Sequence, residues 1–183
     1  MGWTAEQKQE SREKIINSAA ELFTKDGFDK IAINDVMKHA GLTRGAFYNH
    51  FSSKSELYAE AILSAAHQAK SHTLDRSGFQ LSDIIETYLS DAHRQGDFCC
   101  PLAFLTTDIH QRDDKVRATY TRVLKGFINS IHEFDETEGN IEEAEAIKKA
   151  VLMIGGVAIA RAVNEDDFAE QLLSACREGV NSQ

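Results

Sequence analysis

The chain has 183 residues, of which 42% are hydrophobic and 27% are charged, and its formal net charge is −9. This composition excludes a disordered protein and is sufficient for one large core or two small ones. No apolar stretch reaches the length of a membrane span, and residues 1–14 are polar where a secretory signal would be apolar, so a cytoplasmic protein without a membrane partner is expected.

The spacing of apolar residues predicts an all-α protein of about nine helices. Proline occurs once, and no segment shows the sustained alternation typical of a strand. The first helix is expected over residues 6–25, where apolar side chains recur on one face, and Gly27 ends it. A second follows over about residues 33–40 and ends at Gly41.

Two further short signals follow directly in the chain. Thr43 can cap a third helix, whose apolar residues Phe47 and Phe51 would point back into a core. Ser53 and Glu56 match a capping box, in which each side chain accepts the backbone N–H of the other residue, and this box starts a fourth helix. The sequence therefore predicts three short helices followed by a longer connecting helix.

The charge divides the chain into two parts. Residues 1–54 contain eight Lys/Arg and seven Asp/Glu, whereas the remainder contains 12 and 22. Only the first part could approach a polyanion without strong repulsion. We therefore expect one domain over residues 1–53 and a larger helical domain over residues 54–183, with the fourth helix as the connection.

The second and third helices, joined by a turn at Gly41, have the helix-turn-helix arrangement. In such a unit the second helix can enter the DNA major groove and present its first residues to the bases. Thr43, Arg44 and Gly45 occupy that position, and Arg44 can donate two hydrogen bonds to guanine or reach a phosphate. The alternative is an ordinary helical core, because helix pairs joined by glycine turns are common. Further polar candidates on the outward side and at the next helix are Tyr48, Asn49, His50 and Lys54.

The run "GFDKIAINDVMKHAGLTRGAFYNHFSSKSELY" resembles the DNA-binding domain of the TetR/AcrR family of transcriptional regulators, over about residues 11–63. The resemblance implies a dimeric all-α repressor whose first three helices bind double-stranded operator DNA. The family usually has Thr or Ser before the second helix, where this chain has Ile31 and Ala32, so a cap worth about 1 kcal/mol is missing. Asn34 could take over part of that phosphate contact. The resemblance places at the DNA the residues Arg44, Gly45, Tyr48, Asn49, His50 and Lys54.

In the resembled family, the last two long helices pair with those of a second copy as a four-helix bundle. We therefore expect residues 142–163 and 166–180 to form a homodimer interface. Ordinary packing within one chain is the alternative explanation for the small residues there. A symmetric dimer would place two recognition helices one DNA turn apart, which suits a palindromic operator. The small residues are Ala150, Gly155, Gly156, Ala158, Ala160 and Ala162.

The resemblance also implies an effector cavity among the fourth to seventh helices. An aliphatic and aromatic lining would favour an apolar or aromatic small molecule, although each candidate also fits a plain core. Possible polar contacts are Tyr88, His93 and Thr107. The apolar candidates are Leu89, Phe104, Leu105, Ile109, Tyr120, Leu124 and Phe127.

Adjacent thiols precede the single proline in the sequence "DFCCPL". Cys100 is expected at a helix N-cap, where free amides and the helix dipole lower a thiol pKa. The alternative function is therefore a repressor of the same fold in which Cys99 and Cys100 sense oxidants or electrophiles. The opposing interpretation is a pair of small buried residues, with Asp97 disfavouring the thiolate.

Other functional classes are less well supported by the residues. Cys100 with His93 or His110 could imitate a nucleophile and its base, but no oxyanion site accompanies them. The three cysteines and seven histidines lack the spacing of a zinc site, and no cofactor motif occurs. A helical adaptor would have a neutral or acidic third helix. We therefore expect not an enzyme but a ligand-responsive repressor, released from its operator by a small molecule.

Overall fold

The computed structural model describes residues 4–73, 80–96, 100–135 and 142–181, and over these ranges the chain is helical and has no strand. The all-α prediction is therefore confirmed. The helices of the first half are α1 (Ala5–Asp26), α2 (Ile33–His39), α3 (Arg44–Phe47), α4 (Lys54–Thr73) and α5 (Leu81–Tyr88). Those of the second half are α6 (Asp91–Gln95), α7 (Pro101–Phe104), α8 (Thr106–Ile109), α9 (Asp114–Asp135), α10 (Glu143–Ala162) and α11 (Asp166–Asn181).

The described residues contain eleven helices, whereas the sequence predicted about nine. The difference arises because two segments expected as single helices are each broken in the middle. Leu89, with φ −90° and ψ 36°, ends α5, and the Ser90 hydroxyl accepts the N–H of His93 to start α6. Leu105 separates α7 from α8, without a side-chain cap on α8. The apolar spacing runs through both breaks, so it did not reveal them.

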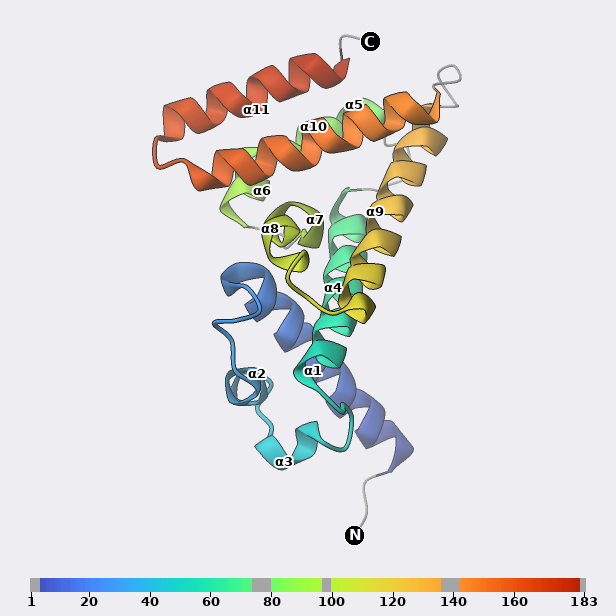
Figure 1. The fold of residues 1–183 in the computed structure, drawn as a ribbon, viewed down its shortest axis with the longest axis vertical. Coiled ribbons are helices and arrows are strands. Elements are labelled where there is room, and N and C mark those ends of the chain that lie inside the picture. The colour runs from blue at the N-terminus through green and yellow to red at the C-terminus, as the bar shows by residue number, and fades with distance from the viewer. Residues whose placement is uncertain (1–3, 74–79, 97–99, 136–141, 182–183) are drawn as a thin grey trace.

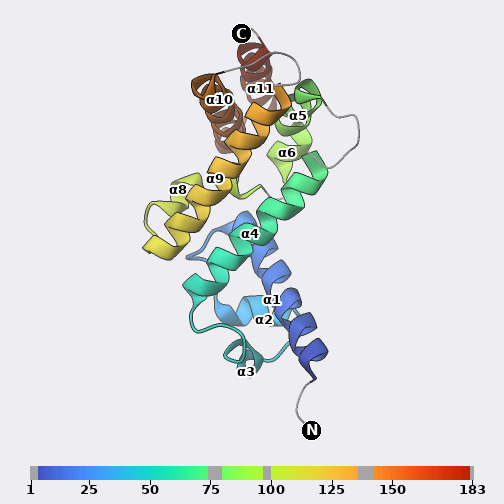
Figure 2. The same ribbon diagram turned by 90° about the vertical axis from the view of Figure 1, so that its right-hand side faces the viewer.

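The helices form an elongated molecule with two ends (Figure 1). Helices α1, α2 and α3 lie at one end, and α10 and α11 lie side by side at the other. Helix α4 packs against α1 and α9 and runs along the long axis between the ends (Figure 2). This arrangement makes α4 the direct physical connection between the two parts of the chain.

Two hydrophobic cores correspond to the two ends. The first contains α1–α3 and the first half of α4, with Ile15, Phe23, Phe47 and Tyr58 essentially inaccessible to solvent. It also includes residues of α8 and of the start of α9. The second core lies among α5, α7, α9, α10 and α11. The corner between α8 and α9 is thus built into the core of the amino-terminal helices.

The small residues of α10 serve mainly to pack that helix within the chain. Ala150, Gly156 and Ala160 are buried. A Cβ atom at Gly156 would lie 2.8 Å from Sγ of Cys176 on α11, closer than real Cβ atoms approach, and 3.0 Å from Cδ2 of Leu89. Gly156 therefore allows α10 and α11 to approach closely. In contrast, a Cβ at Gly155 would meet nothing within 4 Å.

No helix in the described ranges is long and apolar enough to cross a lipid bilayer.

Candidate DNA-binding surface and effector cavity

The turn between α2 and α3 depends on Gly41. Its φ of +69° lies in the left-handed region, which favours glycine. The N–H of Leu42 donates to the carbonyl of Met37 at 2.9 Å, and that of Gly41 donates to Lys38 at 3.1 Å. These bonds satisfy the last carbonyls of α2 in a Schellman-type ending. The chain consequently leaves α2 in a fixed direction, and α3 begins at Arg44.

The start of α2 lacks the side-chain cap, as the sequence predicted. Ala32 occupies the N-cap position and has no side-chain hydrogen bond to offer. Its own N–H, however, donates to Oδ2 of Asp35 at 2.8 Å. That carboxylate also stands in the first turn, where the helix dipole favours a negative charge. Half of the usual capping arrangement is therefore retained.

Helix α3 has a buried side and an exposed side. Phe47 and Phe51 are 0% and 2% exposed, and both belong to the first core, as expected from the sequence. Tyr48 is 60% exposed, and its ring packs edge-to-face with that of Phe47, with centroids 5.2 Å apart. Thr43 occupies the N-cap position, although its side chain makes no cap hydrogen bond. The other exposed residues on this side are Thr43, Arg44, Gly45 and Asn49, with Asn34 exposed on α2.

His50 is partly withdrawn from this exposed side. Its Nε2 lies 3.2 Å from the hydroxyl of Ser11 on α1. Burial, followed by the nearby charges of Lys8 and Arg12, lowers the pKa of His50, which favours the neutral ring. His50 therefore joins the end of α3 to α1.

Lys54 is turned toward the interior of the protein. Its ammonium lies 4.0 Å from the centre of the Phe28 ring and 5.7 Å from that of Phe23, and it donates to the carbonyl of Phe28. Burial is the main cause that lowers the pKa of Lys54. Phe28 lies in the connection between α1 and α2, so Lys54 holds that connection against the start of α4.

The capping box at the start of α4 is shifted by one residue from its predicted form. The N–H of Glu56 donates to the Ser53 hydroxyl at 3.1 Å, as expected. The Glu56 carboxylate, however, accepts the N–H of Ser52 at 2.8 Å and its hydroxyl at 2.5 Å. These bonds fix the loop between α3 and α4.

A cluster of charged groups joins this unit to the rest of the chain. The Arg112 guanidinium, between α8 and α9, donates to both oxygens of Asp29 at 2.9 and 2.6 Å and to Asp108 at 2.8 Å. Asp108 also accepts the hydroxyl of Tyr58 on α4 at 2.7 Å. The hydrogen bonds from Arg112 lower the pKa of Asp29, and burial raises that of Tyr58. This cluster could not be predicted from sequence, because Asp29 and Tyr58 are far from Arg112 and Asp108 in the chain.

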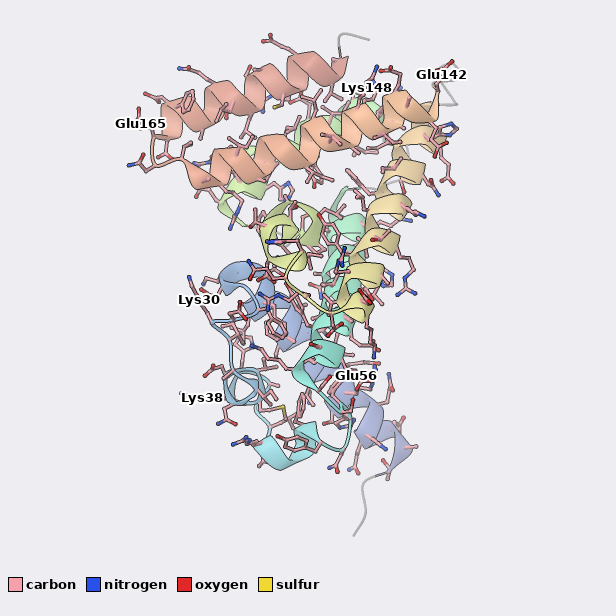
Figure 3. All side chains as sticks on the ribbon, viewed as in Figure 1. Lys30, Lys38, Glu56, Glu142, Lys148 and Glu165 are labelled. Atoms are coloured by element: carbon pink, nitrogen blue, oxygen red, sulfur yellow. The ribbon has the colours of Figure 1, made fainter. Side chains whose placement is uncertain are left out.

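Two lysines lie in the half of the molecule that carries α3. In Figure 3, Lys38 projects outward beside α2 and Lys30 projects outward from the connection between α1 and α2, whereas Glu142, Lys148 and Glu165 lie near the opposite end. Both lysines are exposed. The end that carries α3 therefore offers cations in addition to Arg44.

A cavity of about 300 Å³ lies among α4, the end of α5, α7 and α9. Leu63, Ala66 and Ala69 of α4 face Val123 and Phe127 of α9 across it. The remaining lining residues are His67, Lys70, Tyr88, Cys100, Pro101, Leu102, Arg122, Gly126 and Ser130.

Of the predicted effector contacts, Tyr88 and Phe127 line this cavity. Leu89, His93 and Leu105 are buried in the cores instead, and Thr107 is exposed. Phe104 packs beneath Arg161, whose guanidinium lies 3.5 Å from the ring centre. Ile109 is buried in the first core, and Leu124 packs against the second. Tyr120 donates its hydroxyl to the carbonyl of Leu102 at 2.9 Å.

His93 illustrates why a polar residue in an apolar stripe need not be a ligand contact. It is 0% exposed, and its Nδ1 lies 2.6 Å from the carbonyl of Tyr88. Its ring also stacks on Phe104. Burial lowers the pKa of His93 to about 4, so the ring is neutral at pH 7. The histidine closes the end of α5 rather than facing the cavity.

The expected activation of Cys100 is not found. Cys100 stands at the N-cap of α7, as predicted, but it is 3% exposed. Burial raises the pKa of its thiol, and this outweighs the hydrogen bonds from Tyr88 and from the amides of Ala103 and Leu102. The prediction of a lowered pKa was therefore wrong. Cys99 lies outside the described residues.

Sequence reasoning missed most of the cavity lining, including Lys70, Arg122 and Gly126. The predicted residues were chosen from the most regular apolar stripes, which mark the side of a helix that enters the core. The cavity lies among α4, α5, α7 and α9, and its lining includes small and polar residues outside those stripes. In the described ranges, no three His, Cys, Asp or Glu side chains are placed to share a metal ion.

Comparison with known proteins agrees with this arrangement. Residues 15–61 match the family model described as "Bacterial regulatory proteins, tetR family". The HTH-type transcriptional regulator TtgR of Pseudomonas putida is 41% identical over 69 residues, which are 38% of this chain and 32% of TtgR. The match to AcrR of Shigella flexneri, 40% over 57 residues, covers 31% of this chain and 26% of that protein. The chain thus matches about a third of the length of these relatives.

A longer match extends into the second part of the chain. YvdT of Bacillus subtilis, named an uncharacterized HTH-type transcriptional regulator, is 39% identical over 140 residues, or 69% of this chain and 70% of YvdT. Among solved structures, a TetR-family regulator from Cytophaga hutchinsonii superposes over 100% of this chain and 98% of its own, with a TM-score of 0.78 and 17% identity. Escherichia coli NemR, solved in its reduced form, superposes over 94% of this chain and 95% of its own, with a TM-score of 0.73 and 15% identity. The fold is thus shared along the whole chain.

Proposed function

Because this chain belongs to the TetR family of bacterial regulatory proteins, we propose that it is a DNA-binding transcriptional regulator that represses genes from a palindromic operator and is released by a small molecule. It would act in the cytoplasm, where bacterial DNA is accessible. The observation that carries the proposal is the exposed side of α3. Four polar or flexible positions and Tyr48 face solvent there, while Phe47 and Phe51 anchor the helix in a closed core.

The proposed contact surface consists of residues whose polar groups are available to DNA. Arg44 would contact a base edge or a phosphate, and Thr43, Tyr48 and Asn49 would contact phosphates or bases beside it. Gly45 would allow close approach of the backbone, and Asn34 would reach a phosphate from α2. We assign His50 and Lys54 a supporting role, because Ser11 and Phe28 already occupy their polar groups.

We propose that two copies associate through α10 and α11. Four large apolar side chains of α10 are exposed in the single chain, among them Val151 at 63% and Ile159 at 56%. On α11, Phe168 is 46% exposed. A contiguous apolar surface of this kind is typical of a protein interface. Its location at the end opposite α3 leaves both recognition helices free to face one DNA duplex (Figure 1).

Release by an effector would act through α4. The same helix contributes Leu63, Ala66 and Lys70 to the cavity and begins at Lys54, directly after α3. An effector that binds more tightly to the conformation with α4 in one position than to the conformation with α4 in another would shift the spacing of the two α3 helices in the dimer. The ratio of the effector's affinities for the two conformations sets the upper limit on the loss of DNA affinity.

The test compares variants of the exposed side of α3 on operator DNA selected from genomic fragments. Arg44→Ala should weaken operator binding by about 5- to 150-fold, the effect of about 1–3 kcal/mol expected for a base contact. Tyr48→Ala should also weaken it. The matched control is Arg117→Ala, an exposed arginine of α9 that pairs only with the exposed Asp114 among the described residues. Equal operator affinity in all three variants and the wild type would refute the assigned surface.

A further inference from the structure

At the inner end of the cavity, the described lining residues carry no charge. Its residues at the end of α5 and on α7 are buried, with Tyr88, Cys100 and Leu102 each 3% exposed. The ring of Phe127 stacks on that of Tyr88, with centroids 5.1 Å apart, and forms an aromatic wall. The Tyr88 hydroxyl and Cys100 Sγ lie 3.3 Å apart and satisfy each other. Burial raises the pKa of both groups, so they remain neutral. This end suits an apolar body.

The exposed part of the lining, here called the mouth, has a different character. It is formed by Lys70 and His67 of α4 and by Arg122 and Gly126 of α9, all of them exposed. Among the described residues that line the cavity, none is Asp or Glu. Neither Lys70 nor Arg122 forms an ion pair or hydrogen bond with another described residue. Two cations without a carboxylate partner thus border an apolar cavity.

This lack of partners is unusual for the second part of the chain, which is strongly acidic. Most of its other described cations are occupied: Arg112 binds two carboxylates, Arg177 binds Glu170, and Lys149 donates to the carbonyl of Val180. Lys125 of α9 also has no partner among the described residues, but it does not line the cavity. Lys125 therefore provides a matched control for a mouth cation.

We infer that the cavity binds an amphipathic monocarboxylate, with its apolar body against the aromatic wall of Tyr88 and Phe127 and its carboxylate at Lys70 and Arg122. Hydrogen bonds between such cations and a carboxylate are stronger than neutral ones. The volume of about 300 Å³ is at the lower end for small-molecule sites, so the body is a single ring or a short alkyl chain. This inference names the effector class for the proposed function and rests on that function only for its regulatory consequence.

Binding is measured by isothermal titration calorimetry on the full chain without DNA. The probes are 4-phenylbutanoate and octanoate, each compared with the primary amide and the primary amine of the same skeleton. At least one carboxylate should bind at least tenfold more tightly than its amide, and the amine should bind most weakly. The preference should decrease as salt is raised, because the mouth is exposed to solvent.

Two substitutions test the mouth directly. Lys70→Gln and Arg122→Gln should each reduce the preference for carboxylate over amide while leaving amide affinity within about twofold. Lys125→Gln should leave the preference unchanged. Gly126→Trp tests the cavity itself: a Cβ there meets nothing within 4 Å, so the bulky side chain can be accommodated and should weaken acid and amide alike. Thermal unfolding of each variant checks that it remains folded.

Three results would overturn the inference. The first is equal affinity for acid and amide, and the second is no binding of either carboxylate to the wild type. The third is a loss of the preference for carboxylate over amide in Lys125→Gln as large as in Lys70→Gln and Arg122→Gln. Because the assay contains no DNA, its outcome is independent of operator binding. A protein that binds its operator but shows no acid preference would refute this inference alone. A protein that prefers the acids but binds no operator would refute the proposed function alone.

Discussion

Replacing Arg112 with methionine should loosen the junction between the recognition unit and the rest of the chain. Arg112 is the only residue of the described charged cluster that touches both Asp29, after α1, and Asp108, on α8. Its guanidinium also lies 4.5 Å from the centre of the Phe28 ring. Methionine keeps part of the aliphatic packing but removes all of these polar contacts.

The magnitude is dominated by Asp108. The side chains of Arg112 and Asp108 are only 10% and 20% exposed, whereas Asp29 is 71% exposed and its pair with Arg112 is screened by water. Without Arg112, the Asp108 carboxylate keeps Tyr58 as a partner but loses its cation, at a cost of roughly 2 kcal/mol. Loss of the contact with Phe28 adds about 0.5–1 kcal/mol. We therefore expect Arg112→Met to lower the free energy of unfolding by about 2–3 kcal/mol.

Urea unfolding, followed by circular dichroism at a fixed protein concentration, measures this difference. Asp29→Asn should cost much less than Arg112→Met, since Asp29 is largely exposed. Arg117→Met, on the neighbouring turn of α9, is the control and should be nearly neutral. If Arg112→Met were no more destabilising than Asp29→Asn, the assignment of the stabilisation to the buried half of the cluster would be refuted.

Three other predictions concern His93, Lys54 and the dimer. Burial holds the pKa of His93 at about 4 against 6.5 in the unfolded chain, so the stabilisation from a neutral ring is complete above pH 6.5 and is lost as pH falls toward 4. From pH 7 to pH 5 this should lower the free energy of unfolding of the wild type by about 2 kcal/mol. In urea titrations over the same range, His93→Phe should lose about 2 kcal/mol less than the wild type. Lys54→Met should leave the slope of log affinity against log salt concentration for operator DNA unchanged, because the ammonium faces the Phe28 ring. If the slope became smaller by about 1, Lys54 would instead contact a phosphate. Val151→Glu should convert the dimer to a monomer in sedimentation velocity, and an unchanged dimer would exclude α10 from the interface.

The recognition unit was predictable because its signals are local. Gly27 and Gly41 end their helices with positive φ, and the aromatic residues of α3 enter the core at the expected spacing. The contacts of Lys54 were not predictable. They depend on Phe28, 26 residues earlier, which only the folded chain brings beneath the ammonium. Local spacing cannot report such a tertiary contact.

The proposed effector site was less predictable than the proposed DNA-binding surface for a related reason. A cavity exists where two helices fail to fill the space between them, and that depends on the course of α4 relative to α9. Burial of Cys100 likewise depends on the helices around it, and it reversed the pKa shift that the N-cap position alone predicts. Tyr88 and Phe127 were found because they border both the core and the cavity.

The most direct test of the proposed function is fluorescence anisotropy of the purified protein on labelled DNA from upstream of its own gene, and on genomic fragments enriched by the protein. The proposal predicts tight binding to a palindromic sequence, at least 1,000-fold tighter than to random DNA at physiological salt, with affinity falling steeply as salt increases. Affinity for every fragment equal to that for random DNA, at low and at physiological salt, would contradict it.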